Sequence, residues 1–285
     1  MTRTVSVVIP AKNEAASIGN VVAAVAAVLP GAEIIVVDDG SADGTGEAAA
    51  AAGAQVLRHR VSRGNGAAVK SGARQATGSV LVFMDADGQH DPRDIPRLLA
   101  LLDEGYDMAV GSRARQMHAG TARWLANSIY NRLASWMTGT NIPDLTSGFR
   151  AARSDYFREF LPLLPNGFSY PTTSTMAFLR AGYGVAFEPV NVNSRAEGTQ
   201  SHVRPLLDGG RFLLIIFRVA TLYAPLKLFA PLSALLFAGG LAYSTYTLTM
   251  LGRFTNFGAL LLVTALLVFL IGLVSEQITA LIYKR

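Results

Sequence analysis

The sequence of 285 residues contains no cysteine. Disulfide bonds, thiolate metal sites and cysteine nucleophiles are therefore excluded. Acidic residues are scarce in the last 82 residues, where only Asp208 and Glu276 stand beside seven lysines and arginines. Residues 1–203 balance 18 basic against 18 acidic side chains, so the net charge of +5 lies wholly in the carboxyl-terminal segment. Because this excess flanks apolar segments, it favours an anionic membrane surface over nucleic acid as the partner.

The amino terminus lacks a long hydrophobic run. Its mostly apolar stretch of six residues ends at Pro10 and is too short for the core of a signal peptide. We therefore expect residues 1–203 to form a domain that stays in the cytosol.

Two long apolar stretches without charge are present near the carboxyl end, at residues 228–252 and 254–275. Each is long enough to cross about 30 Å of hydrocarbon as a helix. Residues 227–285 are therefore predicted to form a hairpin of two transmembrane helices, at about 228–251 and 258–283. Basic residues at both ends of the hairpin predict that these ends are cytoplasmic in the cell (inner) membrane, and Arg253 alone opposes this orientation. The alternative is a pair of buried helices in a soluble protein.

Arginines recur at every seventh position just before the hairpin, at Arg204, Arg211 and Arg218. Seven residues are nearly two helical turns, so the three guanidinium groups share one face of an otherwise apolar helix. Residues 204–226 are therefore predicted to form an amphipathic helix in the membrane interface. Glu276 lies near the cytoplasmic end of the second span, where we expect it to pair with an interfacial arginine or with a neighbouring subunit of a homo-oligomer.

Strand and helix patterns alternate through the first 112 residues. The predicted strands are residues 4–9, 33–37, 55–57, 80–84 and 108–111, and the predicted helices are residues 15–29, 44–52, 67–76 and 92–102. Such alternation is typical of an α/β fold with a mainly parallel sheet that helices cover on both faces. It predicts a nucleotide-binding architecture whose ligands lie at the carboxyl ends of the strands.

Polar residues follow three of these strands, in residues 10–14 (PAKNE), 38–45 (DDGSADGT) and 85–90 (DADGQH). Because the carboxyl ends of parallel strands share one edge of the sheet, we expect the three loops to converge. Two carboxylates one residue apart are poor core residues and good ligands for a hard cation that holds a phosphate. The alternative for residues 85–90 is an acidic turn before a helix that Asp91 and Pro92 cap.

A glycine-rich segment, residues 63–66 (RGNG), stands at a predicted helix start, with Lys70 one turn further on. Backbone amides at such a position can bind a phosphate. The spacing matches neither a dinucleotide fingerprint nor a P-loop, so a plain helix cap is an equal alternative.

Together, the three strand-end motifs resemble the signature of family 2 glycosyltransferases. Residues 111–113 (GSR) and 146–150 (TSGFR) are similar to the polyprenyl-phosphate branch, typified by dolichyl-phosphate mannose synthase and bacterial undecaprenyl-phosphate sugar transferases. The similarity covers residues 4 to about 202, and the two-helix tail matches several bacterial members. It implies a GT-A fold and inverting transfer of a sugar from a UDP- or GDP-linked donor to a polyprenyl phosphate.

The resemblance also implies roles for individual residues. The nucleotide would meet Pro10, Asn13, Glu14, Asp38, Asp39 and Asp85. The metal ligands would be Asp85, Asp87 and Gln89, an all-oxygen set that suits Mg²⁺ or Mn²⁺. The implied catalytic residues are Asp87, Arg113, Arg123 and Arg195, and the implied acceptor-phosphate residues are Arg113, Arg123, Asn127 and Ser201. Asn127 stands where a serine is frequent in the family, and residues 195–202 (RAEGTQSH) have one residue more than its Arg-x-x-Gly-x-Ser motif.

The chemistry of such a transfer agrees with these residue types. A metal ion stabilises the charge that builds on the departing diphosphate. The acceptor is already anionic, because a phosphate monoester has its second pKa at about 6, so arginines matter more than a strong general base. A solvated surface charge is the alternative for Arg123 and Arg150.

Two other functions stay open. A processive membrane glycan synthase would need a Gln-x-x-Arg-Trp motif, but Gly120 stands where glutamine is required before Arg123 and Trp124. A non-catalytic scaffold that binds nucleotide sugars is disfavoured by the intact Asp85 and Asp87.

Overall fold

The computed structural model describes residues 3–113, 121–167, 169–191, 217 and 221–283. The chain divides into two compact units, which we describe separately. The sheet unit comprises residues 1–136 and 140–203, and the hairpin unit comprises residues 137–139 and 204–285.

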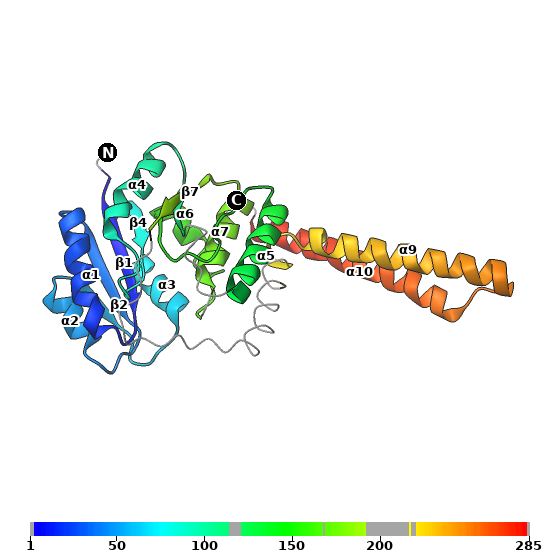
Figure 1. Cartoon of the computed structure of the whole chain (residues 1–285), viewed down its shortest axis with the longest axis horizontal. Coiled ribbons are helices and arrows are strands. Elements are labelled where there is room, and N and C mark those ends of the chain that lie inside the picture. The colour runs from blue at the N-terminus through cyan, green and yellow to red at the C-terminus, as the bar shows by residue number, and fades with distance from the viewer. Residues whose placement is uncertain (1–2, 114–120, 168, 192–216, 218–220, 284–285) are drawn as a thin grey trace. The chain divides into compact units, whose positions relative to one another are not determined.

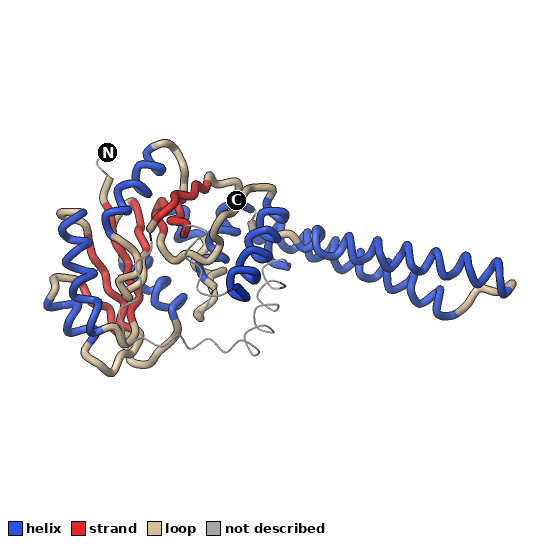
Figure 2. Tube along the Cα trace, in the orientation of Figure 1, coloured by secondary structure: helices blue, strands red, loops and turns tan. Residues whose placement is uncertain are grey.

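Seven strands form one mixed sheet in the sheet unit, shown in red in Figure 2. They are β1 (Val5–Ala11), β2 (Glu33–Asp38), β3 (Gln55–Arg58), β4 (Val80–Phe83), β5 (Met108–Arg113), β6 (Arg150–Arg153) and β7 (Val185–Val190). Their order is β3-β2-β1-β4-β6-β5-β7, and β6 alone runs antiparallel to its neighbours. The predicted α/β fold with a mainly parallel sheet is confirmed.

The first four predicted helices are present (Figure 1). They are α1 (Ala15–Val28), α2 (Thr45–Ala51), α3 (Asn65–Gln75) and α4 (Ile95–Asp103), the last preceded by the short 3-10 helix η1 (Pro92–Asp94). The Asp91 carboxylate accepts a hydrogen bond from the Arg93 amide at 2.9 Å, so the predicted cap is present. Three further helices, which the sequence pattern did not predict, are α5 (Thr121–Thr138), α6 (Ser154–Glu159) and α7 (Tyr170–Arg180).

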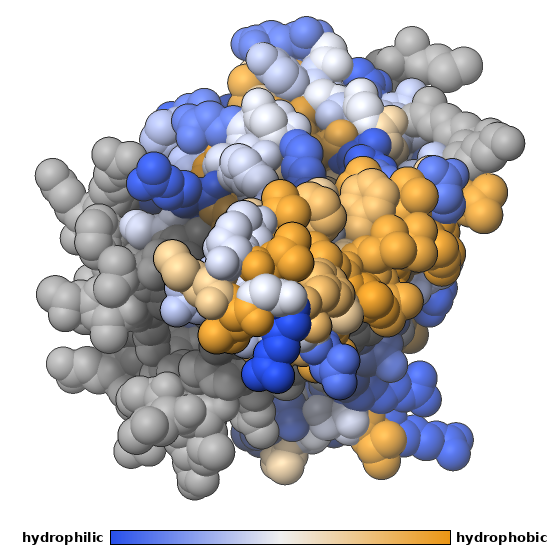
Figure 3. All heavy atoms as spheres, turned by 90° about the vertical axis from the view of Figure 1, so that its right-hand side faces the viewer, coloured by the Kyte–Doolittle hydropathy of each residue, from blue (hydrophilic) through white to orange (hydrophobic). Residues whose placement is uncertain are grey.

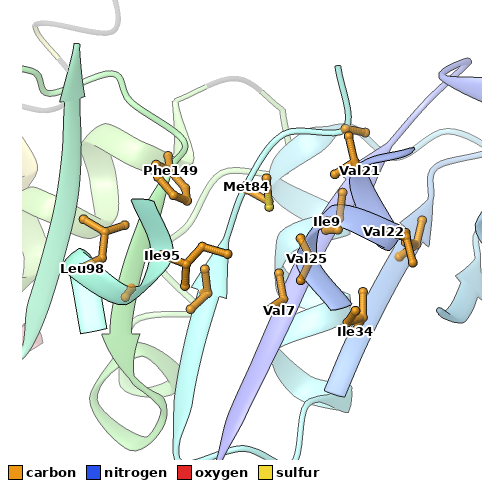
Figure 4. Close-up of a cluster of buried hydrophobic side chains, with 14 of the residues drawn as sticks. Val7, Ile9, Val21, Val22, Val25, Ile34, Met84, Ile95, Leu98 and Phe149 are labelled. Carbon is orange, nitrogen blue, oxygen red and sulfur yellow. The ribbon is translucent and has the colours of Figure 1, made fainter. Parts of the chain in front are cut away.

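Alternate residues of the central strands face an apolar core on one side of the sheet. Figure 4 shows this core, in which side chains of β1 and β2 pack against one face of α1, while α4 covers the neighbouring part. The labelled members are Val7, Ile9, Val21, Val22, Val25, Ile34, Met84, Ile95, Leu98 and Phe149. The fully buried apolar face of β4 continues this core and places residues 85–90 at the sheet's carboxyl edge.

Close backbone packing holds α3 on the opposite face. A Cβ atom at Gly72 would lie 2.3 Å from the Val8 side chain, and one at Gly66 would lie 2.0 Å from the Pro165 carbonyl oxygen. The amides of Gly66 and Ala67 donate to the carbonyls of Gly167 and Asn166. The glycine-rich segment therefore joins α3 to residues 165–167, and the amides of Gly66 and Ala67 are engaged by protein rather than presented to a phosphate.

Replacement of Gly66 by alanine is expected to destabilise the protein by about 2 kcal/mol or more. Overpacking costs about 1–3 kcal/mol when side chains can shift, and here the obstacle is backbone. The unfolding midpoint of the full-length protein in detergent measures the loss. Gly19→Ala is the matched control, because its added methyl group meets nothing nearer than 4.0 Å. An unchanged midpoint for Gly66→Ala would contradict this packing.

The hairpin unit contains α9 (Pro225–Leu251) and α10 (Asn256–Ile282), which confirms the predicted helical hairpin. Both helices are long and apolar enough to cross a membrane. Their buried residues are mostly small: Ser233, Gly240, Ser244 and Thr247 of α9, and Gly258, Ala265, Gly272 and Thr279 of α10. On α10 these recur at every seventh residue, and a Cβ atom at Gly272 would lie 2.6 Å from that of Phe229. Large apolar side chains cover the outer surface of the hairpin, whose connected end faces the viewer in Figure 3.

Polar contacts join the helices of the hairpin. The Ser233 hydroxyl donates to the Ala265 carbonyl at 2.8 Å, and the Glu276 carboxylate accepts from the Leu226 amide at 3.2 Å. The second contact satisfies a free amide in the first turn of α9. Most of the predicted interfacial helix, residues 204–226, lies outside the described residues.

Candidate functional site

The loops after β1, β2 and β4 meet at one edge of the sheet. These strands are neighbours and run parallel, so their carboxyl ends lie together, as predicted. The first two loops are bonded to each other: the Asn13 amide donates to the Ser41 hydroxyl at 3.0 Å, and the Ala42 amide donates to the Asn13 side-chain oxygen at 3.1 Å. Asn13 has a φ of +55°, a left-handed conformation that asparagine tolerates better than most residues.

Asp39 lies buried at the end of β2 and accepts four hydrogen bonds. Oδ1 accepts from His59 Nδ1 at 2.7 Å and from the Arg63 amide at 2.8 Å. Oδ2 accepts from the Ser62 hydroxyl at 2.7 Å and from the Gly64 amide at 2.8 Å. Burial alone would raise the pKa of Asp39, but these bonds outweigh it and lower the pKa to about 2. A carboxylate has about four acceptor positions, so Asp39 is fully engaged in ordering the loop before α3.

The other residues predicted to bind the nucleotide differ in how far they reach the surface. Pro10 is buried within β1, and Asp38 is fully buried with Oδ1 bonded to the Ser41 amide at 2.8 Å. Asn13 is exposed and Glu14 is half-buried. The exposed members can contact a ligand directly, whereas Asp38 orders the loop that carries Ser41.

Asp85, Asp87 and Gln89 are all half-buried in the loop after β4. The side chain of Asp85 is 38% exposed. Enclosure by the protein raises the pKa of Asp85 and the charge of Asp87 adds to the rise, which outweighs the effect of cationic neighbours. The backbone N–H of Gln89 donates to Asp87 Oδ1 at 3.1 Å, which closes a tight turn between the two residues.

This loop fits a divalent cation. Its donor set is two carboxylates and one amide oxygen, and a cation between the carboxylates would offset both the desolvation of Asp85 and its repulsion by Asp87. His90 Nδ1 is buried 3.8 Å from Asp85 Oδ2 without a hydrogen-bond partner among the described residues. No three acidic or histidine side chains in the described part of the chain form a metal site by themselves. Oxygen atoms of a ligand would have to complete the coordination.

Arg113 lies at the carboxyl end of β5, on the same edge of the sheet. Its Nε and Nη2 donate to the two carboxylate oxygens of Asp144 at 2.7 and 3.1 Å, and Nη2 also donates to the Thr146 hydroxyl at 2.6 Å. Burial opposes the charged forms, but the pair outweighs it, lowering the pKa of Asp144 and raising that of Arg113. The Arg113 side chain stays 31% exposed, and Nη1 has no hydrogen-bond partner among the described residues. Arg113 is therefore held in place, and one of its donor groups is not used by any described residue.

Arg150 is fully buried, so the surface-charge alternative is wrong for this residue. Its guanidinium donates to carbonyl oxygens of Ser147 and Pro171 and to hydroxyl groups of α7. No carboxylate among the described residues accepts a hydrogen bond from it. Burial lowers the pKa of Arg150.

Four predicted site residues cannot be placed in this geometry. Arg123 and Asn127 belong to α5, but their side chains lie outside the described part of the structure, as do Arg195 and Ser201 altogether. Sequence reasoning missed Asp144, which stands two residues before the TSGFR motif. Its signal was a single acidic residue beside an apolar one, too weak to separate it from a loop residue.

The low pKa of Asp39 predicts a pH-dependent contribution to stability. The pKa in the folded state lies below the ordinary value of 3.8, so the contribution is present above about pH 4 and is lost as the pH falls towards 2. Its size is roughly 2 kcal/mol. Urea unfolding of the wild type and of Asp39→Asn should therefore differ at pH 7 and converge near pH 2–3. A constant difference between pH 6 and pH 3 would contradict the assignment.

Comparisons with known proteins match a family model to each of the two units. A family model described as Glycosyl transferase family 2 matches residues 6–161, and one described as GtrB C-terminal hairpin matches residues 224–281. Polyprenol monophosphomannose synthase of Mycolicibacterium smegmatis is 33% identical over 236 residues, which cover 77% of this chain and 86% of the relative. Undecaprenyl-phosphate mannosyltransferase of Micrococcus luteus is 32% identical over 208 residues, which cover 67% of this chain and 84% of the relative.

The fold is also similar to solved structures. Glucosyl-3-phosphoglycerate synthase from Mycobacterium tuberculosis, in complex with Mn²⁺, UDP and glucosyl-3-phosphoglycerate, gives a TM-score of 0.61 at 25% identity. The match covers 76% of this chain and 78% of that chain. A structure of the same enzyme with Mg²⁺ and UDP gives a TM-score of 0.60.

Proposed function

The chain belongs to glycosyl transferase family 2, and on this premise we propose that it transfers a sugar from a nucleotide diphosphate to a polyprenyl phosphate at the cytoplasmic face of the cell membrane. The observation that carries the proposal is the placement of Asp85 and Asp87 on the same sheet edge as Arg113, whose Nη1 has no hydrogen-bond partner among the described residues. The two carboxylates suit a metal-bound diphosphate, and the guanidinium of Arg113 suits a second phosphate. The acceptor class is supported by the names of two relatives, polyprenol monophosphomannose synthase and undecaprenyl-phosphate mannosyltransferase.

The metal site would consist of Asp85, Asp87 and Gln89, holding Mg²⁺ or Mn²⁺. When bound, the ion would stabilise the charge that develops on the departing diphosphate. Support comes from the solved complexes of glucosyl-3-phosphoglycerate synthase, which contain UDP with either ion. The nucleoside would lie against Asn13 and Glu14 and against the loop that Asp39 orders, with Pro10 and Asp38 beneath them.

The acceptor would be held by arginines. Arg113 presents Nη1 while Asp144 fixes the rest of its guanidinium, so little side-chain freedom is lost on binding. We assign Arg123, Asn127, Arg195 and Ser201 to the same phosphate. The acceptor monoester is anionic near neutral pH, so its oxygen can attack the sugar without a strong general base, and a single displacement would invert the anomeric centre.

The hairpin gives this chemistry its location. A polyprenyl phosphate keeps its chain in the bilayer and its headgroup at the interface, so the transferase domain must work at the membrane surface. We propose that residues 1–203 form this domain, residues 204–226 an interfacial helix, and residues 227–285 the two membrane spans.

Asp87→Asn should abolish sugar transfer while leaving the unfolding midpoint unchanged. The substitution removes one of two carboxylates from the metal site, and a loss of about a hundredfold or more is expected. Membranes are incubated with labelled nucleotide sugars, Mg²⁺ or Mn²⁺, and undecaprenyl phosphate, and the product is extracted into organic solvent and cleaved by mild acid. Asp103→Asn is the control, since that side chain is 66% exposed and its ion pair among the described residues is with Arg3.

The same assay separates the other functions. A growing water-soluble polymer would indicate a processive synthase, and nucleotide binding without turnover would indicate a scaffold. Wild-type activity in Asp87→Asn would contradict the metal site. A screen of UDP- and GDP-linked sugars in this assay identifies the donor.

Single cysteines can test the membrane orientation, because the chain has none of its own. Asn256→Cys, at the start of α10, should react with a membrane-impermeant maleimide in intact cells. Gln75→Cys, exposed at the end of α3, should react only after permeabilisation. The reverse pattern would place the transferase domain outside the cytoplasm.

A further inference from the structure

Gly148 brings the backbone of the TSGFR segment against Asp85. A Cβ atom at Gly148 would lie 3.1 and 3.2 Å from the two carboxylate oxygens of Asp85. This is a tight contact, and any residue with a side chain would have to displace the carboxylate or the loop. The backbone at Gly148 therefore limits where the Asp85 carboxylate can lie.

The next residue limits Asp85 from another direction. The Phe149 ring stacks on the His90 ring, with centroids 5.1 Å apart and planes 18° from parallel. His90 Nδ1 lies 3.8 Å from Asp85 Oδ2. Residue 148 thus lies close beside Asp85, and residue 149 approaches it through His90, so both limit the geometry around one predicted metal ligand.

Two buried side chains fix this segment. The Tyr170 hydroxyl donates to the Gly148 carbonyl at 3.1 Å, and burial raises the pKa of Tyr170, so the hydroxyl stays a donor. Arg150 Nη2 donates to the Ser147 carbonyl. Arg150 Nη1 donates to the Pro171 carbonyl at 2.9 Å and to the Ser174 hydroxyl at 2.7 Å. Its guanidinium carbon lies 5.6 Å from the Tyr170 ring centre. The segment is thereby attached to the first turns of α7.

A plain structural role does not explain the choice of arginine here. No carboxylate among the described residues accepts a hydrogen bond from Arg150, so burial of this cation costs free energy that an apolar side chain would avoid. Arg150 instead bonds the Ser147 carbonyl, in the loop beside Asp85, and the Pro171 carbonyl at the start of α7. Its contacts point to control of the Asp85 loop.

We propose that Arg150 and Tyr170 are positioning residues of the metal site. They fix residues 147–149 so that the Gly148 backbone and the stack of Phe149 on His90 hold the Asp85 carboxylate in one orientation. The inference rests on the proposed metal-dependent function and adds to it the parts of the protein that set metal affinity. Groups that orient a metal ligand typically change metal affinity by about 10- to 100-fold when they are removed.

The test uses two small substitutions in the full-length protein in detergent, because removal of the buried Arg150 would disturb folding. Tyr170→Phe deletes the hydroxyl that holds the Gly148 carbonyl and keeps the ring. Gly148→Ala adds a methyl group against the Asp85 carboxylate. Mn²⁺ binding is followed by electron paramagnetic resonance with saturating UDP and, separately, GDP, and the KM for Mn²⁺ and kcat are measured in the transfer assay.

Both variants should weaken Mn²⁺ binding by roughly tenfold and raise the KM for Mn²⁺ to match, while kcat at saturating Mn²⁺ changes little. Tyr183→Phe is the matched control for the first variant, because it deletes a buried hydroxyl that bonds Glu159 instead. Gly19→Ala is the control for the second. Both controls should bind Mn²⁺ like the wild type.

Unchanged Mn²⁺ affinity in Tyr170→Phe and Gly148→Ala would overturn the positioning role, and so would a lower unfolding midpoint as the only effect. Wild-type protein that binds no Mn²⁺ with either nucleotide would overturn the proposed function itself. Mn²⁺ binding by the wild type with unaltered variants would overturn only the inference. The two failures are therefore distinct.

Discussion

The site depends on the attachment of two carboxylates to a strand that cannot move. β4 is buried along its whole length and pairs with β1 on one side and β6 on the other. Asp85 and Asp87 follow this strand closely, so the sheet keeps the two carboxylates near each other. The resulting repulsion and enclosure raise the pKa of Asp85. A divalent cation removes both penalties, because it neutralises the charges and replaces the lost hydration with direct ligation.

Arg113 and Arg150, the two arginines near these carboxylates, have different surroundings and suit different roles. Arg113 is paired with Asp144 and keeps one face exposed, so the pair is neutral overall and the remaining Nη1 donor can bind an anion. Arg150 is buried among neutral oxygens and presents nothing to solvent. An exposed, oriented guanidinium suits ligand binding, whereas a buried one suits the ordering of a loop. Residue type alone does not separate these roles, and the difference comes from the partners that the fold supplies.

The sequence predicted much of the fold, but it could not predict which partners surround each arginine. Strong apolar runs predicted β1 to β5 and α1 to α4, and the strand-end motifs predicted which loops would meet. β6 was missed because its sequence, RAAR, has charged residues at both ends, one of which the fold buries. The packing of Gly66 on Pro165, and the bond from His59 to Asp39, join residues that no local pattern relates. The glycine-rich segment consequently looked equally suited to a phosphate and to a helix cap.

Small residues allow close approach in both units, for different physical reasons. In the sheet unit, Gly72 lets a helix pack densely on an apolar strand. In lipid, apolar burial between helices gains little, so Gly272 and its heptad partners favour van der Waals contact between backbones. Each hairpin helix has 27 residues, about 40 Å of rise against about 30 Å of hydrocarbon. Glu276 lies six residues before the end of α10, so it can cap α9 close to the interface, where a carboxylate keeps much of its hydration. The position of this acidic residue is therefore explained by the structure of the hairpin rather than by ion transport.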